Sequence, residues 1–218
     1  MCGRFAFYSP SEATAVLFGV SGAPPVEARY NIAPTQYVAA IRKGEDGARE
    51  LTMLRWGLVP FWARDPSIGN RMINARAETV AEKPAFRAAF RHRRCLVLAD
   101  GFYEWRREGS VKTPYYISAA DGRPFAFAAL WENWNSKDSD ESIESTTLIT
   151  TAADAFMAAL HHRMPVVLDP ATAATWLDGG AEALAYALGH GPELRAWPVD
   201  RRVNNARNEG EDLIEAAS

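Results

Sequence analysis

The sequence contains little cysteine and no long apolar stretch. Only two of its 218 residues are cysteines, Cys2 and Cys95, which excludes a disulfide-built scaffold and indicates a reduced setting. No apolar run approaches the roughly 18 residues that a membrane-spanning helix needs. The first residues also lack the charged and then apolar segments of a secretory signal. We therefore expect a cytoplasmic protein that does not bind membranes.

Sequence motifs for metals and nucleotide cofactors are missing as well. The four histidines and two cysteines form neither a Cys-x-x-Cys nor a His-x-x-x-His pattern, so no metal site is predicted. The chain has no Gly-x-x-x-x-Gly-Lys phosphate loop and no Gly-x-Gly-x-x-Gly fingerprint. It has no Gly-x-Ser-x-Gly elbow of a serine hydrolase either. We expect activity without a cofactor.

Positive charge is present almost entirely as arginine. Of 24 basic residues, lysine occupies only positions 43, 83, 112 and 137. The net charge of −3 predicts no bulk attraction to nucleic acid, although a local basic groove remains compatible with it. Arginine binds planar oxyanions such as phosphate in a bidentate manner. A GC-rich genome produces the same bias, so only the positions of the arginines can separate the two explanations.

The pattern of short strands and turns predicts a single α+β domain over residues 1–218. Hydrophobic residues make up 48% and charged residues 23%, as in ordinary globular proteins, and no linker or repeat divides the chain. Hairpins dominate, which favours a mainly antiparallel, barrel-like β-sheet with interspersed helices. Strands are predicted at 36–42, 50–56, 95–99, 102–105, 114–118, 124–130 and 147–151.

Two helices carry clear terminal signals. Residues 9–12 (Ser-Pro-Ser-Glu) predict a capping box at the start of a helix that ends near Gly19. Asp169 and Pro170 predict the start of a helix that ends at Gly179. Further helices are predicted at 84–91, 152–160 and 181–188.

Three connecting segments have distinct compositions. Asp121 and Gly122 predict the turn of a hairpin that joins 114–118 to 124–130. Residues 57–75 contain glycines and prolines typical of a long irregular loop. Residues 133–146 are polar and acidic, and we expect an exposed loop insertion that lies away from any DNA-binding groove, because its charge would repel DNA.

Cys2 directly follows the initiator methionine, and a small residue at this position permits removal of Met1. Cys2 then carries a thiol and an α-amine on adjacent carbons. The pKa of an α-amine is about 7.7, so about 17% of it is neutral at pH 7. A neutral amine attacks an aldehyde to form an imine, which the neighbouring thiol can close into a thiazolidine. Alternatively, the thiolate attacks an amide with the amine as base, or Cys2 is simply a small apolar residue in a first strand.

Four short segments are rich in residue types that carry chemistry: 29–34 (Arg-Tyr-Asn-Ile-Ala-Pro), 74–78 (Asn-Ala-Arg-Ala-Glu), 100–105 (Asp-Gly-Phe-Tyr-Glu-Trp) and 161–165 (His-His-Arg-Met-Pro). Each also has a structural explanation. Asn74 can cap a helical turn, and Arg76 can pair with Glu78 or with solvent. Glu104 can lie on the solvated face of a strand, and His161 can close the preceding helix.

Taken together and in order, these segments resemble the SOS response-associated peptidase (SRAP) family over essentially the whole chain. The resemblance also includes Met-Cys-Gly-Arg at the start, Trp-Gly-Leu-x-Pro at 56–60, and the closing Val203-Asn204, Asn208 and Leu213-Ile214. It implies a DNA-damage protein that captures abasic sites in single-stranded DNA through a thiazolidine between Cys2 and the ring-opened sugar aldehyde. It also implies an association with damaged DNA, and we expect a monomer.

The resemblance implies roles for individual residues. Cys2 supplies the amine and the thiol, and Asn74 orients the amine or the sugar. Glu104 acts as general acid in opening the sugar ring, and His161 is a second proton-transfer group. His161 is preferred to its neighbour His162 because the motif is His-x-Arg-Met-Pro.

A second group of residues is implied in DNA binding. Arg76, Arg163 and Arg4 contact the flanking phosphates. Trp62 and Pro34 stack on or wedge beside the bases, which suits sequence-independent single-strand binding. Thr150 lies close to the site.

Two other functions remain open from the sequence. Class II glutamine amidotransferases also begin Met-Cys-Gly, but this resemblance stops at residues 1–3, and the chain lacks an Asn-Gly-Asp-like motif. A non-covalent reader of single strands is the other alternative, in which Cys2 has no chemical role. The family name also implies peptidase activity, which we expect only as removal of Met1 or adduct processing.

Overall fold

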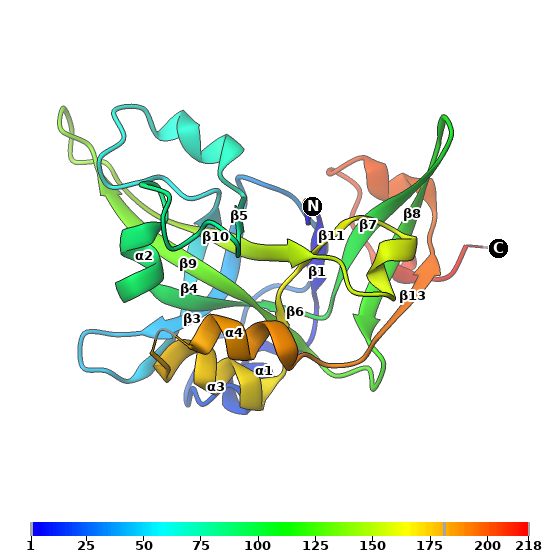
Figure 1. The fold of residues 1–218 in the computed structure, drawn as a ribbon, viewed down its shortest axis with the longest axis horizontal. Coiled ribbons are helices and arrows are strands. Elements are labelled where there is room, and N and C mark those ends of the chain that lie inside the picture. Colours follow the sequence, from blue (N-terminus) through cyan, green and yellow to red (C-terminus); the bar gives the residue numbers. More distant parts are fainter. Residues whose placement is uncertain (1, 181, 218) are drawn as a thin grey trace.

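The computed structural model describes residues 2–180 and 182–217, and within them the chain forms two β-sheets with short helices around them (Figure 1). A five-stranded sheet has the order β13-β8-β7-β1-β2. Its strands are β1 (Phe5–Phe7), β2 (Arg29–Ile32), β7 (Gly101–Glu108), β8 (Val111–Ala119) and β13 (Leu194–Pro198). An eight-stranded sheet contains β3 (Tyr37–Lys43), β4 (Arg49–Trp56), β5 (Asn74–Arg76), β6 (Arg94–Ala99), β9 (Phe125–Asn135), β10 (Ser142–Ala152), β11 (Arg163–Pro165) and β12 (Val167–Leu168).

Five strands of the larger sheet close on themselves. β3 pairs with β4 and β6, β6 pairs with β9, and β9 pairs with β10, all antiparallel. The ring closes where β10 runs parallel to β4, with Ser145 opposite Arg55 and Thr146 opposite Trp56. The prediction of an α+β fold with a mainly antiparallel, barrel-like sheet is therefore confirmed. Because closure gives each of these five strands a neighbour on both sides, the barrel is protected from edge-to-edge pairing with other chains.

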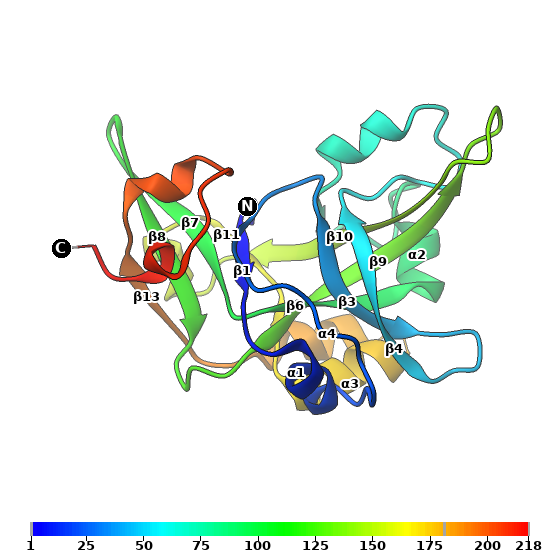
Figure 2. The ribbon, with the colours of Figure 1, turned by 180° about the vertical axis from the view of Figure 1, so that it is seen from behind.

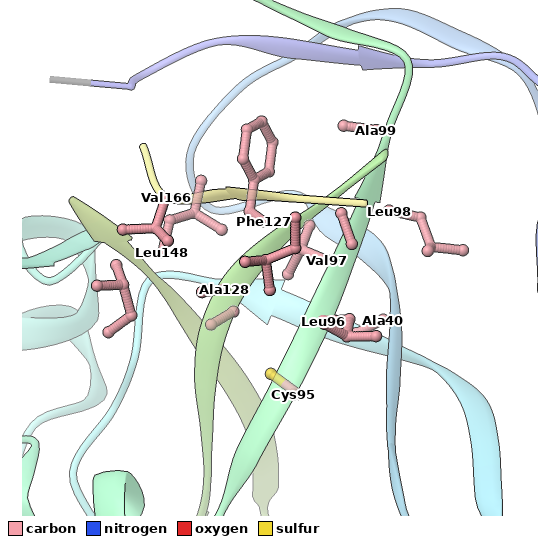
Figure 3. Close-up of a cluster of buried hydrophobic side chains, with 14 of the residues drawn as sticks. Ala40, Cys95, Leu96, Val97, Leu98, Ala99, Phe127, Ala128, Leu148 and Val166 are labelled. Carbon is pink, nitrogen blue, oxygen red and sulfur yellow. The ribbon is translucent and has the colours of Figure 1, made fainter. Parts of the chain in front are cut away.

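β6 and residues 125–130 of β9 are buried on both faces, because one face lines the barrel interior and short helices pack against these strands. On β6, Leu96, Val97 and Leu98 are all fully buried, and Figure 3 shows them beside Phe127 and Ala128 of β9. This explains why the sequence of β6 is a continuous apolar run and does not alternate with polar residues.

The helices are short and lie outside the sheets. They are α1 (Ser11–Leu17), α2 (Arg87–His92), α3 (Pro170–Asp178) and α4 (Ala183–Gly189), with 3-10 turns at η1 (Pro66–Arg71), η2 (Met157–Ala159), η3 (Arg201–Asn204) and η4 (Glu211–Ile214). The predicted start of α3 is confirmed, since Asp169 accepts a hydrogen bond from the Thr172 amide at 2.8 Å. The helix predicted at 84–91 is present as α2, and that at 181–188 as α4, within the described residues. No helix in the described ranges is long and apolar enough to cross a membrane.

The capping box predicted at residues 9–12 is wrong. The helix begins at Ser11 without a side-chain cap. The Ser9 hydroxyl donates instead to Asp100 Oδ1 at 2.5 Å. The hydroxyl therefore donates to a tertiary acceptor where a capping box would have it accept from a helix amide, because Asp100 is buried and needs donors.

The hairpin predicted around Asp121 and Gly122 is also wrong. β8 pairs with β7 through the turn at Gly109, which has a φ of +61°, and with β13 on its other side. β9 belongs to the barrel, so residues 120–124 carry the chain from one sheet to the other. Residues 106–108 of β7 are polar and charged, so the sequence pattern predicted that this strand ends at Trp105. It therefore did not predict the turn at Gly109 that joins β7 to β8.

Two further segments differ from expectation. β9 and β10 pair as far as Asn135 and Ser142, so only residues 136–141 form an exposed turn where a loop over 133–146 was expected. The expected helix at 152–160 is a single 3-10 turn. The chain must return at once to pair Arg163 with Ala152 of β10, and this leaves no room for a longer helix.

The irregular stretch at 57–75 contains two elements that the sequence pattern did not predict, η1 and the start of β5. β5 pairs in parallel with β10, where Leu148 lies opposite Asn74 and Thr150 opposite Arg76. It thereby extends the sheet beyond the end of β4. Figures 1 and 2 show the N-terminal end of the chain between this part of the barrel and the five-stranded sheet.

Asp100 fixes the corner where β1 leaves the sheet. It accepts hydrogen bonds from the amides of Tyr8 and Ser9 at 2.6 and 2.8 Å, in addition to the Ser9 hydroxyl. We expect Asp100→Ala to lower the free energy of unfolding by about 2–3 kcal/mol, because it leaves buried donors without an acceptor. Urea denaturation measures this decrease. Asp140→Ala, in the exposed turn at 136–141, is the control, and equal stability of the two variants would contradict the assignment.

Candidate active site

Cys2 lies fully buried, three residues before the start of β1. Its carbonyl accepts a hydrogen bond from Asn74 Nδ2 at 2.8 Å, and its thiol lies 3.9 Å from the carbonyl oxygen of Arg4. Two residues singled out from the sequence, Cys2 and Asn74, are thus brought together. Asn74 occupies the first position of β5 and does not cap a helix, so that structural explanation is wrong.

The segment after Cys2 is held by a network centred on Asn31. Arg4 Nη1 donates to Asn31 Oδ1 and to the Val203 carbonyl, both at 2.7 Å. The Asn31 amide donates to the carbonyls of Asn205 and Asn208 at 3.0 and 2.9 Å. This network explains why Arg-Tyr-Asn at 29–31 and the asparagine-rich segment at 203–208 occur in one chain, because the first binds the backbone of the second.

Glu104 and His161 line one pocket. The pocket has a volume of about 450 Å³ and also includes Trp105, Arg107, Lys112 and Asn204. Glu104 is only 4% exposed, so it does not lie on a solvated face of β7. Burial raises the pKa of the Cys2 thiol well above its ordinary value, and the charge of the Glu104 carboxylate raises it further. Cys2 and Glu104 are therefore within electrostatic reach of each other, and the thiol is neutral at pH 7.

His161 is fixed through its Nδ1 atom. This atom lies 3.0 Å from the Arg163 amide nitrogen and 3.1 Å from the Arg163 oxygen. A tautomer that accepts from the amide carries its proton on Nε2. The ring stacks on His162 with 4.2 Å between centroids, and the charge of His161 is the main cause that lowers the pKa of exposed His162.

Three residues assigned to DNA binding lie on neighbouring strands. Arg76 of β5 is opposite Thr150 of β10, and Arg163 Nη2 donates to the Thr150 carbonyl at 2.8 Å. The Arg163 guanidinium also makes a bidentate contact with Glu78, at 2.5 and 3.0 Å. That contact lowers the pKa of Glu78. Glu78 thus pairs with Arg163. The pairing of Glu78 with Arg76, which the sequence offered as a structural explanation, is not formed among the described residues.

The remaining predicted contacts are more dispersed. Trp62 is 45% exposed on the loop that follows β4, and Pro34 lies half-buried in the turn before β3. Because Tyr37 of β3 is opposite Arg55 of β4, both loops leave the same end of the barrel, which is also the end extended by β5. The Arg4 guanidinium, by contrast, donates through Nη1 to Asn31 and to the Val203 carbonyl.

Cys95 has no place in this site. It is buried in β6, and burial raises the pKa of its thiol to about 12. Its sulfur lies 3.5 Å from Thr146 Oγ1, as expected for a core residue. Within residues 2–180 and 182–217, no group of three or more His, Cys, Asp or Glu side chains is placed to share a metal ion.

The fold and the site define a class of α+β protein in which a buried cysteine at position 2 lies within electrostatic reach of a buried glutamate on the five-stranded sheet. A family model described as SOS response associated peptidase (SRAP) matches residues 1–206. The chain belongs to this family.

Several similar proteins are described as abasic site processing proteins, and some of them match nearly the whole chain. The abasic site processing protein YoaM of Bacillus subtilis is 37% identical over 225 residues, covering 99% of this chain and 98% of that protein. The abasic site processing protein YedK of Escherichia coli is 34% identical, covering 99% of both chains. The abasic site processing protein HMCES of Xenopus tropicalis is 34% identical over 80% of this chain and 60% of its own.

Solved structures have the same fold. A crystal structure of a protein from Bacteroides thetaiotaomicron superimposes with a TM-score of 0.87 at 26% identity, covering all of both chains. One from Bordetella bronchiseptica gives 0.78 at 26% identity over 91% of this chain.

The sequence pattern did not single out the Asn31 network or the partner of Arg163. Both involve residues inside the motifs, but their partners lie far along the chain. We expect Asn31→Ala to speed hydrogen exchange of the amides at 203–208 about tenfold or more, since each orphaned buried polar group costs about 1–3 kcal/mol. Hydrogen exchange measured by mass spectrometry tests this, with exposed Asn133→Ala as control. Unchanged protection at 203–208 would contradict the network.

Proposed function

We propose that this protein processes abasic sites in single-stranded DNA by forming a covalent bond through Cys2. The single observation that carries the proposal is the placement of buried Cys2 against Asn74 and within reach of the Glu104 charge. The names of relatives that cover the whole chain support the substrate. An abasic site is in equilibrium with a ring-opened sugar whose C1′ is an aldehyde, and an aldehyde is the electrophile that an N-terminal aminothiol captures.

The proposed reaction begins after Met1 has been removed. The α-amine of Cys2 adds to C1′, and departure of the carbonyl oxygen as water gives an imine. The sulfur then bonds to C1′ while the thiol proton passes to the nitrogen, which closes a thiazolidine. One water leaves overall, and no oxidant or cofactor is needed. The reaction suits a thiol of raised pKa, because the sulfur attacks only after the electrophilic imine has formed beside it.

Glu104 and His161 are the proposed proton-transfer groups. Glu104 protonates the ring oxygen when the sugar opens, because its carboxyl group lines the pocket in which the sugar would lie. His161 lines the same pocket and is oriented by the Arg163 backbone. Asn74 holds the Cys2 carbonyl and thereby directs the amine at position 2 toward the sugar.

The proposed DNA path crosses the barrel end that β5 extends. Arg76 and Arg163 neutralise phosphates beside the abasic site, and Thr150 lies between them. Trp62 and Pro34 present apolar surfaces to bases at the same end of the barrel. We assign Arg4 to anchoring the N-terminal segment, because its Nη1 donates hydrogen bonds to Asn31 Oδ1 and to the Val203 carbonyl.

Covalent capture is tested with untagged protein and a single-stranded oligonucleotide that contains one abasic site. We expect an adduct that survives denaturing electrophoresis, with the mass of the protein without Met1 plus the oligonucleotide minus one water. Cys2→Ala should bind the oligonucleotide but form no adduct. Glu104→Gln, which keeps the size of the side chain and removes its proton, should slow adduct formation while binding is preserved.

Other outcomes identify the alternatives. A processed Cys2 terminus that forms no adduct but binds DNA would indicate a reversible reader. Hydrolysis of glutamine by the same preparation would indicate an amidohydrolase. Equal rates of adduct formation by Glu104→Gln and the parent would exclude the acid role of Glu104. The proposed role of Cys2 would be unaffected by that result.

The Glu78 carboxylate forms an ion pair with the Arg163 guanidinium, to which we propose that a DNA phosphate binds. Its side chain is 49% exposed and that of Arg163 only 12%, so the carboxylate is the partner that can move away. We expect Glu78→Gln to tighten binding of a single-stranded oligonucleotide about two- to fivefold, since exposed ion pairs contribute about 0.2–1 kcal/mol. Fluorescence anisotropy measures the change. Glu141→Gln alters the net charge equally at a distant turn and serves as control, and weaker binding by Glu78→Gln would mean that Glu78 positions Arg163.

A further inference from the structure

The hairpin of β7 and β8 presents two positive charges side by side. Arg107 and Lys112 are directly opposite each other in the register of the two strands. Both are exposed, and neither forms an ion pair within the described residues. Like charges at opposite positions of a strand pair destabilise it. Arg106 on the same hairpin is different, because it pairs with Glu108 at 3.2 Å and lies over the Tyr115 ring.

This pair of charges borders the same pocket as Glu104 and His161. β1 pairs with β7 at Gly101 and Phe102, and a hydrogen bond joins the Tyr103 amide to the Arg4 carbonyl. Among the described residues no pairing of β7 with β1 continues past Tyr103, and the next residues of β7, Glu104 and Trp105, line the pocket. Its volume of about 450 Å³ is within the range of ligand-binding pockets. The pocket therefore connects the reaction centre to the charged pair.

A DNA strand held at an abasic sugar has a phosphate on each side of that sugar. Arg76 and Arg163 belong to the barrel, on β5 and β11. Figure 1 shows β5 and the β7–β8 hairpin on opposite sides of the N-terminal end of the chain. The arginines of the barrel can therefore serve one flank of the strand, and the other flank needs positive charge on the five-stranded sheet. Glu104 lines the pocket and is buried, whereas Arg107 and Lys112 are exposed, so the sugar would lie at the Glu104 end of the pocket.

We propose that the pocket between Glu104 and the pair Arg107 and Lys112 is a second phosphodiester subsite, which binds the DNA backbone on the flank of the abasic site opposite to Arg76 and Arg163. Arginine at one position supplies a planar fork and lysine at the other a point charge, and both recognise phosphate oxygens without reading the base. The subsite rests on the proposed function, because the abasic sugar fixes which phosphates reach it.

The test measures binding without chemistry. The probe is a fluorescent single-stranded oligonucleotide with one tetrahydrofuran abasic analogue, which has no aldehyde. We expect the double variant Arg107→Ala and Lys112→Ala to bind it about three- to tenfold more weakly at low salt. The slope of log affinity against log salt should become shallower by about 0.7 for each phosphate that the variant no longer neutralises. Arg87→Ala with Lys137→Ala removes the same charge from exposed positions without ion pairs in the described residues, and should change neither quantity.

Single methylphosphonate linkages locate the phosphate that the subsite binds. Neutralising the phosphate on that flank should weaken binding by the parent protein but not by the double variant. Neutralising the linkage at Arg76 and Arg163 should weaken both proteins equally. Circular dichroism establishes that the variants are folded. A double variant with the affinity and salt slope of the parent, or one whose binding is weakened equally by every neutral linkage, overturns the proposal.

The same preparations separate this proposal from the function on which it rests. If the parent protein forms no adduct with a true abasic site while the analogue results are as expected, covalent capture fails and the phosphate subsite stands. If the adduct forms and the double variant is unaffected, capture stands and the subsite fails.

Discussion

The hydrogen bond from Asn74 to the Cys2 carbonyl is the interaction on which the site depends. It joins the N-terminal segment, which leads into the five-stranded sheet, to the strand that extends the barrel. Asn74 can make it only because β5 pairs in parallel with β10 and places the amide beyond the end of β4. On the opposite side, Tyr103 donates its amide to the Arg4 carbonyl. Residues 2–4 are therefore held from both sheets, by Asn74 at Cys2 and by Tyr103 at Arg4, and paired strands supply the rigid support that a loop would lack.

The two sheets contribute different chemistry to this junction. The barrel side provides Asn74 and the arginines, whereas the five-stranded sheet provides Glu104 from the fully buried end of β7. The thiol lies out of water and close to the charge of the carboxylate, and both effects raise its pKa. The thiol of this site therefore keeps its proton at neutral pH. This property is compatible with carbonyl chemistry, in which proton transfer accompanies bond formation, and it is poorly suited to a free thiolate attacking an amide.

The sequence was most informative where the determinants were local. Asp169 and Pro170 start α3 as predicted because an Asp cap needs only the amide three residues ahead. Ser9 fitted the same rule and failed because buried Asp100 competes for its hydroxyl. β8 and β9 were paired across the wrong turn because both segments have a strand pattern, and the pattern does not record which sheet a strand joins. Cys2 and Asn74 were found together only through motif order, since nothing local links position 2 to position 74.

The excess of arginine over lysine has more than one physical cause in this fold. Arg94 donates to the carbonyls of Trp176, Gly179 and Gly180, and so ties the end of α3 to β6. Arg4 braces the N-terminal segment in the same way. A guanidinium can serve several carbonyls at once, whereas an ammonium is a compact point charge that lacks this fixed fork geometry. Part of the arginine content is therefore structural, and a count of basic residues predicts neither DNA binding nor its absence. What distinguishes Arg107 and Lys112 is that they lie opposite each other, beside a pocket, and that neither is paired with an acid in the part of the chain that the structure describes.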